Sequence, residues 1–315
     1  MYHRIADVEV DPWDLAVSPS NFEQHLQVLR KFDVISVEQL VSKLYKRSFA
    51  FKNVCLTFDD AYSDNYQAAK PLLESYKQPA TFFVPTDYIG TGKQFWWDEL
   101  TMIFLTYEKL PERLEVTVDN TQYVFEIGNE GLLDKGDLEK HKLWRWLEEP
   151  PTIRTKVFLK VWELIRPLYG VSLEGTMTSI KEWAGCSWLN EEFNAITIAQ
   201  LKDLGEHPLI DIGLHTASHP ALKFQAHEIQ QKEISECKRF LELNCKNTVN
   251  AIAFPYGDYN TSTLHIAKNE GLSAAFSTDS KPVSTRSNIY ELGRFQVKNW
   301  NGDEFEKQLY SWIKG

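Results

Sequence analysis

The sequence has few of the features that mark disulfide-rich or membrane-spanning proteins. It contains four cysteines among 315 residues, at positions 55, 186, 237 and 245, and none of them forms a CxxC pair. A disulfide framework is therefore not expected, and Cys55 is most simply a small buried apolar residue. No apolar run approaches the roughly 20 residues that a membrane-spanning helix needs.

Positive charge is scarce as well. The 34 lysines and arginines are outnumbered by 44 aspartates and glutamates, which gives a formal net charge of −10. Such a surface argues against nucleic acid or an anionic membrane as the main partner. The first residues lack the basic and then apolar stretch of a secretory signal, so we expect a cytoplasmic protein, with a membrane-peripheral position as the alternative. A mature chain that has lost its signal would look the same.

What the sequence does have is a regular alternation of strand and helix patterns. Its hydrophobic fraction of 43% and charged fraction of 25% are typical of a soluble globular protein. The patterns predict strands at 54–58, 80–84, 209–214, 249–254, 273–277 and 291–297, and helices at 22–32, 66–73, 226–243, 260–270 and from 303. This order indicates an α/β protein with a distorted (β/α) barrel of about seven strands.

The segment from about 91 to 190 breaks this alternation. A hairpin pattern places 114–118 opposite 123–127, and helical patterns follow at 137–148 and 152–168. We expect an inserted, mainly helical subdomain that acts as a lid or stands beside the barrel, which 1–90 and 191–315 would form. The segment also holds seven of the ten tryptophans, namely Trp96, Trp97, Trp144, Trp146, Trp162, Trp183 and Trp188.

Two adjacent carboxylates, Asp59 and Asp60, stand at the end of the strand predicted over 54–58. Neighbouring residues of a strand point to opposite faces, so both can share a site only where the strand gives way to its loop. Like charges this close need a positive group between them, and a metal ion meets that need. A simple helix cap or turn is the alternative.

Two histidines follow the strand predicted over 209–214. His215 and His219 are spaced i and i+4, so a helical turn would bring both imidazoles to one ion. One aspartate and two histidines leave open coordination positions, as catalytic metal sites do. Both motifs follow predicted strands, at the end where barrel enzymes build their sites. Either motif alone occurs by chance, but the two together predict a metal site.

A third element follows the strand predicted over 249–254. Pro255 and Gly257 flank Tyr256 and make a rigid turn that can aim a backbone N–H and an aromatic ring at a fixed point. A plain turn with a packing tyrosine explains these residues equally well when they are taken alone.

Together, these residues resemble the ordered motifs of the polysaccharide deacetylase family, also called the NodB-homology or carbohydrate esterase family 4 domain. The matching stretches are Thr57-Phe58-Asp59-Asp60, His215-Thr216-Ala217-Ser218-His219 and Phe254-Pro255-Tyr256-Gly257. The resemblance implies a distorted (β/α) barrel and a metal-dependent hydrolase that removes an N-acetyl group from an amino sugar in a glycan or glycan precursor.

The resemblance also implies roles for single residues. Asp59 would be the general base, and Tyr256, next to Pro255, would offer its backbone N–H to the oxyanion. One divalent ion would be held by Asp60, His215 and His219. Zinc is the expected ion, with cobalt, nickel or manganese as alternatives.

The general-acid histidine that the family usually carries late in the chain is missing, because no histidine follows His265. The stretch Tyr2-His3-Arg4-Ile5 instead resembles the N-terminal segment of circularly permuted deacetylases that act on poly-N-acetylglucosamine, which implies that His3 is the acid. The first and last strands of a closed barrel are neighbours, so a residue can move from one terminus to the other and keep its place. The alternative is that His3 is a frayed terminal residue.

Other residues depart from the family pattern. Ala253 stands where the third motif commonly has an arginine, Ala61 where glycine usually follows the aspartate pair, and Leu214 where a small polar residue often precedes the first histidine. Arg294 is a candidate to orient Asp59 by a charge-assisted hydrogen bond. An ordinary surface or structural role for Arg294 is the alternative.

Several interpretations of substrate and activity stay open. The partner would be an N-acetylated sugar, a glycan, or a lipid-linked or nucleotide-linked glycan intermediate. The tryptophans of the insertion would either stack on sugar rings or, as we expect for most of them, pack the core of the subdomain. A deformylase or cyclic-amide hydrolase on the same fold is the first alternative activity, and a catalytically dead carbohydrate-binding protein is the second.

Overall fold

The computed structural model describes residues 1–48, 52–186 and 193–314 and divides the chain into two compact units. Unit 1 contains Met1–Asp7, Leu15–Lys93 and Asn194–Gly315, and unit 2 contains Val8–Asp14 and Gln94–Phe193. Unit 2 therefore combines most of the segment that interrupts the strand–helix alternation with a short piece near the N-terminus. Trp188 lies outside the described residues.

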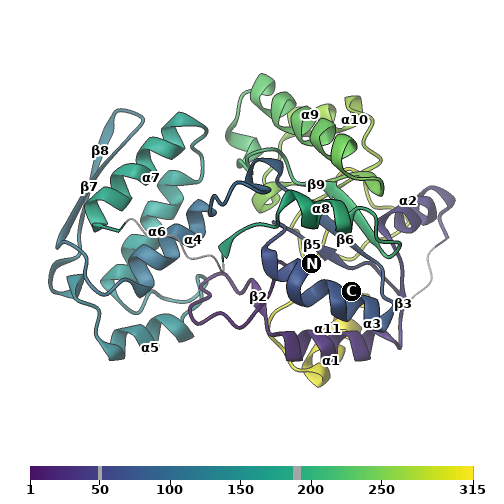
Figure 1. Ribbon diagram of the computed structural model, residues 1–315, viewed down its shortest axis with the longest axis horizontal. Helices are drawn as coiled ribbons and strands as arrows, with labels where there is room; N and C mark the ends of the chain where they lie inside the picture. The colour runs from purple at the N-terminus through teal and green to yellow at the C-terminus, as the bar shows by residue number, and fades with distance from the viewer. Residues whose placement is uncertain (49–51, 187–192, 315) are drawn as a thin grey trace. The chain divides into compact units, whose positions relative to one another are not determined.

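A five-stranded sheet forms the centre of unit 1 (Figure 1). Its strand order is β11-β10-β9-β6-β5, and all neighbouring pairs are parallel. The strands are β5 (Thr57–Phe58), β6 (Ala80–Val84), β9 (Ile210–Leu214), β10 (Thr248–Ala253) and β11 (Ala274–Phe276). Two shorter parallel pairs are β1 (Arg4–Ile5) with β2 (Ala16–Val17), and β3 (Asp33–Val34) with β4 (Asn53–Val54).

Irregular segments continue the hydrogen bonding of the sheet from β11 back to β5. The segment 292–297 bonds to β11 on one side and to the first residue of the chain on the other, and Tyr2 bonds to β5. The bonds include Leu292 N–H to Ala275 O (2.9 Å), Val297 N–H to Met1 O (3.0 Å), Tyr2 N–H to Thr57 O (2.8 Å) and Asp59 N–H to Tyr2 O (3.0 Å). The regular strands thus form a curled half-barrel, which confirms the predicted α/β class and distorted barrel, although 291–297 is not the regular strand that its pattern predicts.

Helices surround this sheet in unit 1, and four of them begin at a side-chain cap. The caps are Ser18, Ser36, Thr197 and Asn260, each of which accepts a bond from the backbone of its first turn. The helices of unit 1 are α1 (Pro19–Leu29), α2 (Val37–Lys46), α3 (Lys70–Tyr76), α8 (Ile198–Leu204), α9 (His227–Asn244), α10 (Thr261–Asn269) and α11 (Gly302–Lys314), with a π-helical turn η1 (Asn65–Ala69) before α3.

Alternate residues of β6 face two different apolar clusters. Phe82 stacks on Phe58, with ring centroids 4.7 Å apart, in the larger cluster. Phe83 belongs to a second cluster that includes the buried residues of α2. A Cβ at Gly213, its partner on β9, would lie 2.5 Å from the Phe83 ring, so only glycine fits there. The two clusters explain why all of β6 is buried and why its sequence is a continuous apolar run.

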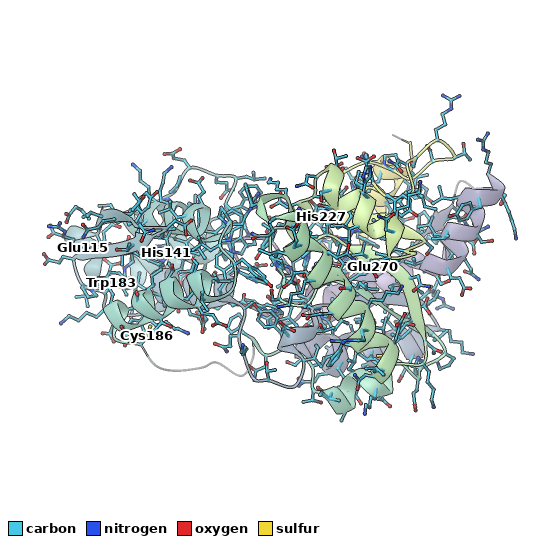
Figure 2. The ribbon with its side chains drawn as sticks, turned by 90° about the horizontal axis from the view of Figure 1, so that it is seen from above. Glu115, His141, Trp183, Cys186, His227 and Glu270 are labelled. Atoms are coloured by element: carbon cyan, nitrogen blue, oxygen red, sulfur yellow. The ribbon has the colours of Figure 1, made fainter. Side chains whose placement is uncertain are left out.

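Polar contacts tie α9 to α10 at the surface of unit 1. Figure 2 labels His227, at the start of α9, and Glu270, just after α10. The His227 ring bonds to the Ser262 hydroxyl over 2.7 Å, and Gln231 bonds to the carboxylate of Glu270. His227 therefore has a structural partner in another helix.

Unit 2 is a helical bundle with one hairpin. Its helices are α4 (Trp96–Thr101), α5 (Lys135–Leu143), α6 (Ile153–Ile165) and α7 (Val171–Ala184), and the hairpin pairs β7 (Arg113–Val118) with β8 (Thr121–Glu126). The turn residues Asp119 and Asn120 both have positive φ, as a two-residue hairpin of this type requires. Helix α7 has no counterpart among the predicted elements.

The segment Val8–Asp14 joins unit 2 through aromatic packing and ion pairs. The Trp13 ring lies 4.9 Å from that of Trp162 and 5.9 Å from that of Trp146. Asp14 pairs with Arg145 at 2.6 Å. Of the insertion's described tryptophans, Trp96, Trp97 and Trp144 are buried, Trp162 and Trp183 are half-buried, and Trp146 is 46% exposed. Most of these side chains therefore help to pack the unit, as expected.

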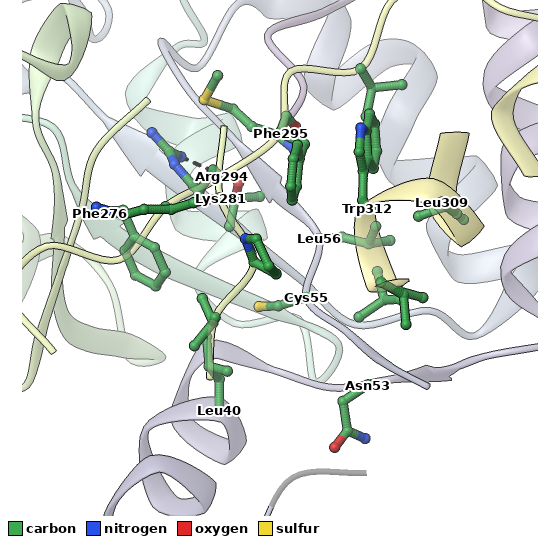
Figure 3. Close-up of a pocket in the computed structure, with 18 of the residues that line it drawn as sticks. Leu40, Asn53, Cys55, Leu56, Phe276, Lys281, Arg294, Phe295, Leu309 and Trp312 are labelled. Carbon is green, nitrogen blue, oxygen red and sulfur yellow. Dashed lines mark hydrogen bonds between the residues drawn. The ribbon is translucent and has the colours of Figure 1, made fainter. Parts of the chain in front are cut away.

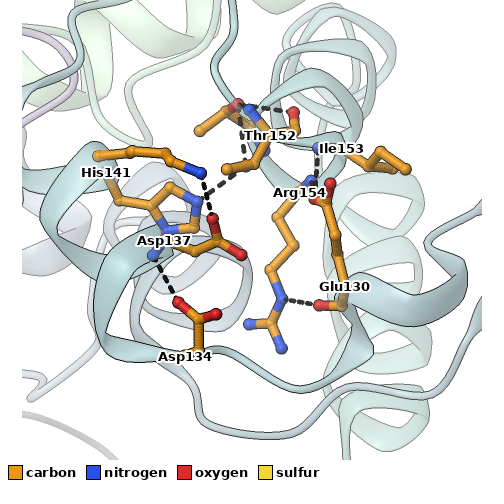
Figure 4. A network of polar contacts seen from close by, with 9 residues as sticks. Glu130, Asp134, Asp137, His141, Thr152, Ile153 and Arg154 are labelled. Atoms are coloured by element: carbon orange, nitrogen blue, oxygen red, sulfur yellow. Dashed lines mark hydrogen bonds and ion pairs between the residues drawn. The ribbon is translucent and has the colours of Figure 1, made fainter.

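A buried arginine holds the loops of unit 2 together (Figure 4). Arg154 is 1% exposed and donates to backbone carbonyls of Glu130, Tyr107 and Gly131 at 2.6–2.7 Å. Next to it, His141 Nδ1 bonds to Leu105 O at 2.8 Å, and its Nε2 bonds to the Thr152 hydroxyl at 2.8 Å. A guanidinium carries five donors and no acceptor, so it suits a nest of carbonyls. Both side chains therefore have structural roles.

No helix formed by residues 1–48, 52–186 or 193–314 combines the length and apolar character of a bilayer-spanning helix.

Candidate metal centre and active site

The structure brings Asp60, His215 and His219 together at the carboxyl ends of β5 and β9. Their ligand atoms lie within 4.8 Å of one another, and all three residues are buried. Asp60 Oδ1 is 3.2 Å from Nε2 of both histidines. Strand β6 lies between β5 and β9 in the sheet, so motifs more than 150 residues apart in the chain end at the same edge.

The protonation of His215 tests whether these residues fit a metal ion. Its Nδ1 lies 2.8 Å from Ala253 O, and a carbonyl oxygen only accepts, so Nδ1 carries a proton. In a neutral imidazole Nε2 then presents a lone pair to the Asp60 carboxylate. Two acceptors 3.2 Å apart need a positive centre between them. A divalent ion bound by two imidazoles and one carboxylate meets that need, with the second ring nitrogen fixed by a carbonyl as in metal sites generally.

The pKa values of His215 and Asp60 reflect their contact with each other. Burial on its own would lower the pKa of His215, but its bond to Asp60 and the charges of Asp59 and Asp60 outweigh burial and raise that pKa. Burial would likewise raise the pKa of Asp60, but its bonds to the two histidines hold that pKa far below the ordinary value. The carboxylate is therefore ionised and ready to bind a cation.

Left-handed backbone conformations cluster at this site. Asp60, Ala61, Thr216, His219 and Tyr256 all have φ between 53° and 71°. Such conformations in residues other than glycine cost on the order of 1–3 kcal/mol each and need support from the surrounding fold. The positive φ of Ala61 explains why glycine usually stands there in the motif that this stretch resembles. The loop from His215 to His219 is consequently not the helical turn that the spacing suggested, because Thr216 and His219 leave helical geometry.

Asp59 is paired with Arg294. Both guanidinium terminal nitrogens donate to the carboxylate, Nη1 to Oδ1 and Nη2 to Oδ2, each at 2.7 Å. The residues are 2% and 6% exposed. Burial on its own would raise the pKa of Asp59, but the charge and hydrogen bonds of Arg294 hold that pKa below its ordinary value. Arg294 lies in the irregular segment 292–297, so the guanidinium beside Asp59 comes from that segment and not from the third motif, where Ala253 stands.

The third motif also reaches the cluster. The Tyr256 ring packs edge-on against the His219 ring, with centroids 4.7 Å apart. Its turn is closed by bonds from Gly257 N–H to Phe254 O and from Asp258 N–H to Pro255 O, each 2.9 Å. A Cβ at Gly257 would lie 2.2 Å from the Thr278 hydroxyl, so this position requires glycine. Pro255 and Tyr256 therefore occupy one fixed conformation beside the metal-ligand candidates.

His3 lies on the same face of the barrel wall as Asp59. Tyr2 pairs with Phe58, and their rings stack 5.2 Å apart, so the next residue of each strand points to the opposite face. Burial lowers the pKa of His3 below its ordinary value, and the negative charges of Asp60 and Asp59 oppose this shift. His3 Nδ1 is buried and has no hydrogen-bond partner among the described residues. The first residues of the chain are thus ordered against β5 and not frayed.

Glu233, in helix α9, supports the loop between the two histidines, a role that none of the sequence motifs predicts. It is 2% exposed, and its carboxylate accepts from Ser218 N–H (2.8 Å) and from the Ser218 hydroxyl (2.7 Å). Its backbone carbonyl accepts from Ala217 N–H at 3.1 Å. A single glutamate in an amphipathic helix looks like a solvent-facing residue, so the sequence carries no signal for this role.

A separate cavity of about 470 Å³ is lined in part by Arg294 (Figure 3). Its mainly apolar lining comes from α2, α11, residues 53–57, residues 281–285 and part of the segment 292–297, with Leu40, Cys55, Leu309 and Trp312 among the residues. It shares Arg294 and Thr57 with the surroundings of Asp59, but none of the metal-ligand candidates is among its lining residues. This cavity is therefore distinct from the candidate active site.

A sequence profile of the polysaccharide deacetylase family matches residues 46–120 and 173–275, which is more than half of the chain. The chain belongs to the polysaccharide deacetylase family. Membership of this family supports an N-deacetylase enzyme and agrees with the motifs that the structure brings together.

Individual relatives agree with this assignment. A poly-beta-1,6-N-acetyl-D-glucosamine N-deacetylase of Staphylococcus aureus (strain MSSA476) is 22% identical over 300 residues, which cover 94% of this chain and 72% of the relative. IcaB from Ammonifex degensii is 18% identical with a TM-score of 0.58, covering 100% of this chain and 95% of that chain. The deacetylase PplD of Streptococcus pyogenes, solved with acetate, is 19% identical with a TM-score of 0.55, covering 100% of this chain and 96% of that chain. The two solved structures show a shared fold.

Proposed function

We propose that this protein is a metal-dependent N-deacetylase that releases acetate from N-acetylglucosamine units of a β-1,6-linked glycan. The observation that carries the proposal is the buried cluster of Asp60, His215 and His219 beside the Asp59–Arg294 pair. The choice of glycan is supported by the Staphylococcus aureus relative, whose match covers 94% of this chain. The position of His3 next to β5 supports this choice further, because the circularly permuted deacetylases that the N-terminal segment resembles act on poly-N-acetylglucosamine.

Asp60, His215 and His219 would hold the ion. This set of ligands suits zinc best and other first-row divalent metals next. When bound, a divalent ion supplies a Lewis acid that polarises the acetyl oxygen and makes water a nucleophile at neutral pH. Asp59, kept ionised and oriented by Arg294, takes the proton of the attacking water.

The remaining steps belong to the third motif and to the N-terminal segment. The Tyr256 N–H, fixed by its left-handed turn, donates to the oxygen on which negative charge develops, a contribution of roughly 3–4 kcal/mol for one such donor. His3 protonates the sugar nitrogen as the C–N bond breaks, because an amine anion cannot leave. The products are acetate and a free amino sugar.

The test measures bound metal and released acetate on the same purified protein. Substrates are β-1,6-linked N-acetylglucosamine oligomers and, for comparison, β-1,4-linked chitooligosaccharides. We expect about one divalent ion per chain and faster acetate release from the β-1,6 series. Asp59→Asn should keep the ion and lose turnover. Release of formate, or opening of cyclic amides, without release of acetate would favour the alternative hydrolases. A protein that binds the glycan, holds no metal and catalyses no hydrolysis would favour a carbohydrate-binding protein.

Removing the charge of Glu233 is expected to weaken metal binding without removing it. Glu233→Gln keeps one acceptor for Ser218 but loses the doubly bonded carboxylate that fixes the loop between the two histidines. Loss of such an outer-shell partner typically costs about 10–100-fold in metal affinity. Competition with a zinc-chelating dye measures the change, and Glu242→Gln on the exposed side of the same helix is the matched control. Equal affinities for the two variants would show that Glu233 does not support the site.

A further inference from the structure

We propose that Asp64 and Asn65 are positioning residues that clamp the N-terminal segment and so hold His3 in the active site. This inference rests on the proposed function, in which His3 is the general acid. It assigns a role to the residues that follow the aspartate pair, for which the motifs gave no reason. The two side chains are 8% and 0% exposed, although both are polar.

The clamp binds the backbone at His3 itself and again two residues later, at Ile5. The Asn65 side-chain amide donates to His3 O at 2.8 Å, and Asp64 Oδ1 accepts from Ile5 N–H at 2.8 Å. The same Asn65 amide also donates to Asp64 Oδ1 at 2.9 Å, which joins the two side chains into one unit. Buried backbone groups need such partners, so the segment is held at two successive points.

An ion pair between Arg4 and Asp64 adds a third contact between the N-terminal segment and the clamp. Arg4 Nε donates to Asp64 Oδ2 at 3.0 Å, and the Arg4 guanidinium lies 4.8 Å from the centre of the Tyr62 ring. Arg4 is 4% exposed. Both carboxylate oxygens of Asp64 therefore bond to the segment that carries His3, one through a side chain and one through the backbone.

The end of β5 explains why side chains, and not strand pairing, hold the N-terminal segment beyond Tyr2. Strand β5 ends at Phe58, and the left-handed conformations of Asp60 and Ala61 turn the chain away from the sheet. The N-terminal segment loses its strand partner on that side after Tyr2, which is the last residue bridged to β5. Asp64 and Asn65 take over as partners just past the turn, where the π-helical turn η1 begins at Asn65. His3 thus sits between a backbone-held residue and a side-chain-held one.

The position of His3 matters for one step only, the protonation of the leaving amine. An acid has to lie within hydrogen-bond reach of the nitrogen that it protonates, and small displacements lower the rate steeply. An amine leaves only when protonated, whereas a nitrophenolate leaves without a proton. Loosening His3 should therefore slow hydrolysis of an N-acetyl sugar much more than hydrolysis of 4-nitrophenyl acetate.

The experiment compares Asn65→Ala, His3→Ala and the double variant on these two substrates. We expect Asn65→Ala to lower kcat for the N-acetyl sugar about 10–100-fold with KM and bound metal unchanged, and to change ester hydrolysis less than about threefold. In the His3→Ala background the same substitution should have no further effect on the sugar, since its target is already gone. Asn269→Ala, at an exposed position of α10, is the control for the substitution itself.

Circular dichroism checks that each variant folds. If Asn65→Ala does not fold, Asn65→Leu replaces it, because leucine has a similar side-chain volume, lacks the amide donor and adds no charge beside Asp64. Equal losses on sugar and ester, or an undiminished effect of the Asn65 change in the His3→Ala background, would overturn the clamp and leave the deacetylase intact. A wild-type protein that releases no acetate from any N-acetyl sugar would instead overturn the proposed function itself.

Discussion

Asp60→Ala is expected to remove the bound divalent ion and to lower deacetylation at least about a thousandfold. Asp60 is the only carboxylate of the three-residue cluster, and its Oδ1 faces both imidazoles at 3.2 Å. Without it two neutral histidines remain, which bind first-row ions far more weakly. A bound ion contributes several kcal/mol to the transition state, and about 4 kcal/mol corresponds to a thousandfold in rate.

Metal analysis and acetate release measure this prediction side by side. Asp303→Ala removes an exposed carboxylate from the first turn of α11 and serves as the matched control, with unchanged metal content and turnover. The metal should return to Asp60→Ala only at concentrations far above those that saturate the wild type. An Asp60→Ala protein that keeps one ion per chain and turns over normally would contradict the assignment of the centre.

Arg294→Met is expected to destabilise unit 1 by about 3–5 kcal/mol and to abolish most of the activity. The substitution leaves the Asp59 carboxylate buried without the guanidinium that bonds both of its oxygens. Removing one member of a buried ion pair costs this much because the remaining charge has neither water nor partner. Asp59 would then gain a proton more readily or turn away, and either change removes a base from the site.

Urea unfolding of unit 1 and acetate release measure the two effects, with Arg286→Met at an exposed position as the matched control. The double variant Asp59→Asn with Arg294→Met should regain part of the lost stability, because it buries no unpaired charge, but no activity. If Arg294→Met unfolds at the same urea concentration as the control, the pair contributes nothing to the fold and the argument from burial is wrong.

The sequence alone determined which residues could do chemistry and the ends of which strands carry them. Strand β6 was predicted with its observed bounds, and Asp59, Asp60, His215 and His219 follow strands as expected. Such predictions succeed because a buried strand is a local pattern of apolar residues, and polar groups that interrupt it stand out. The hairpin of unit 2 was also predictable from a local pattern, because its turn residues and both of its strands are neighbours in the sequence.

Only the tertiary structure decided how these residues are held. Arg294 reaches Asp59 across 235 positions of sequence, and Asn65 reaches His3 across 62. Glu233 supports the histidine loop from a helix whose pattern shows nothing unusual. The segment 291–297 reads as a strand but is irregular, because it bridges β11 and the first residue of the chain. Contacts between distant segments depend on how the chain closes, and no local pattern records that closure.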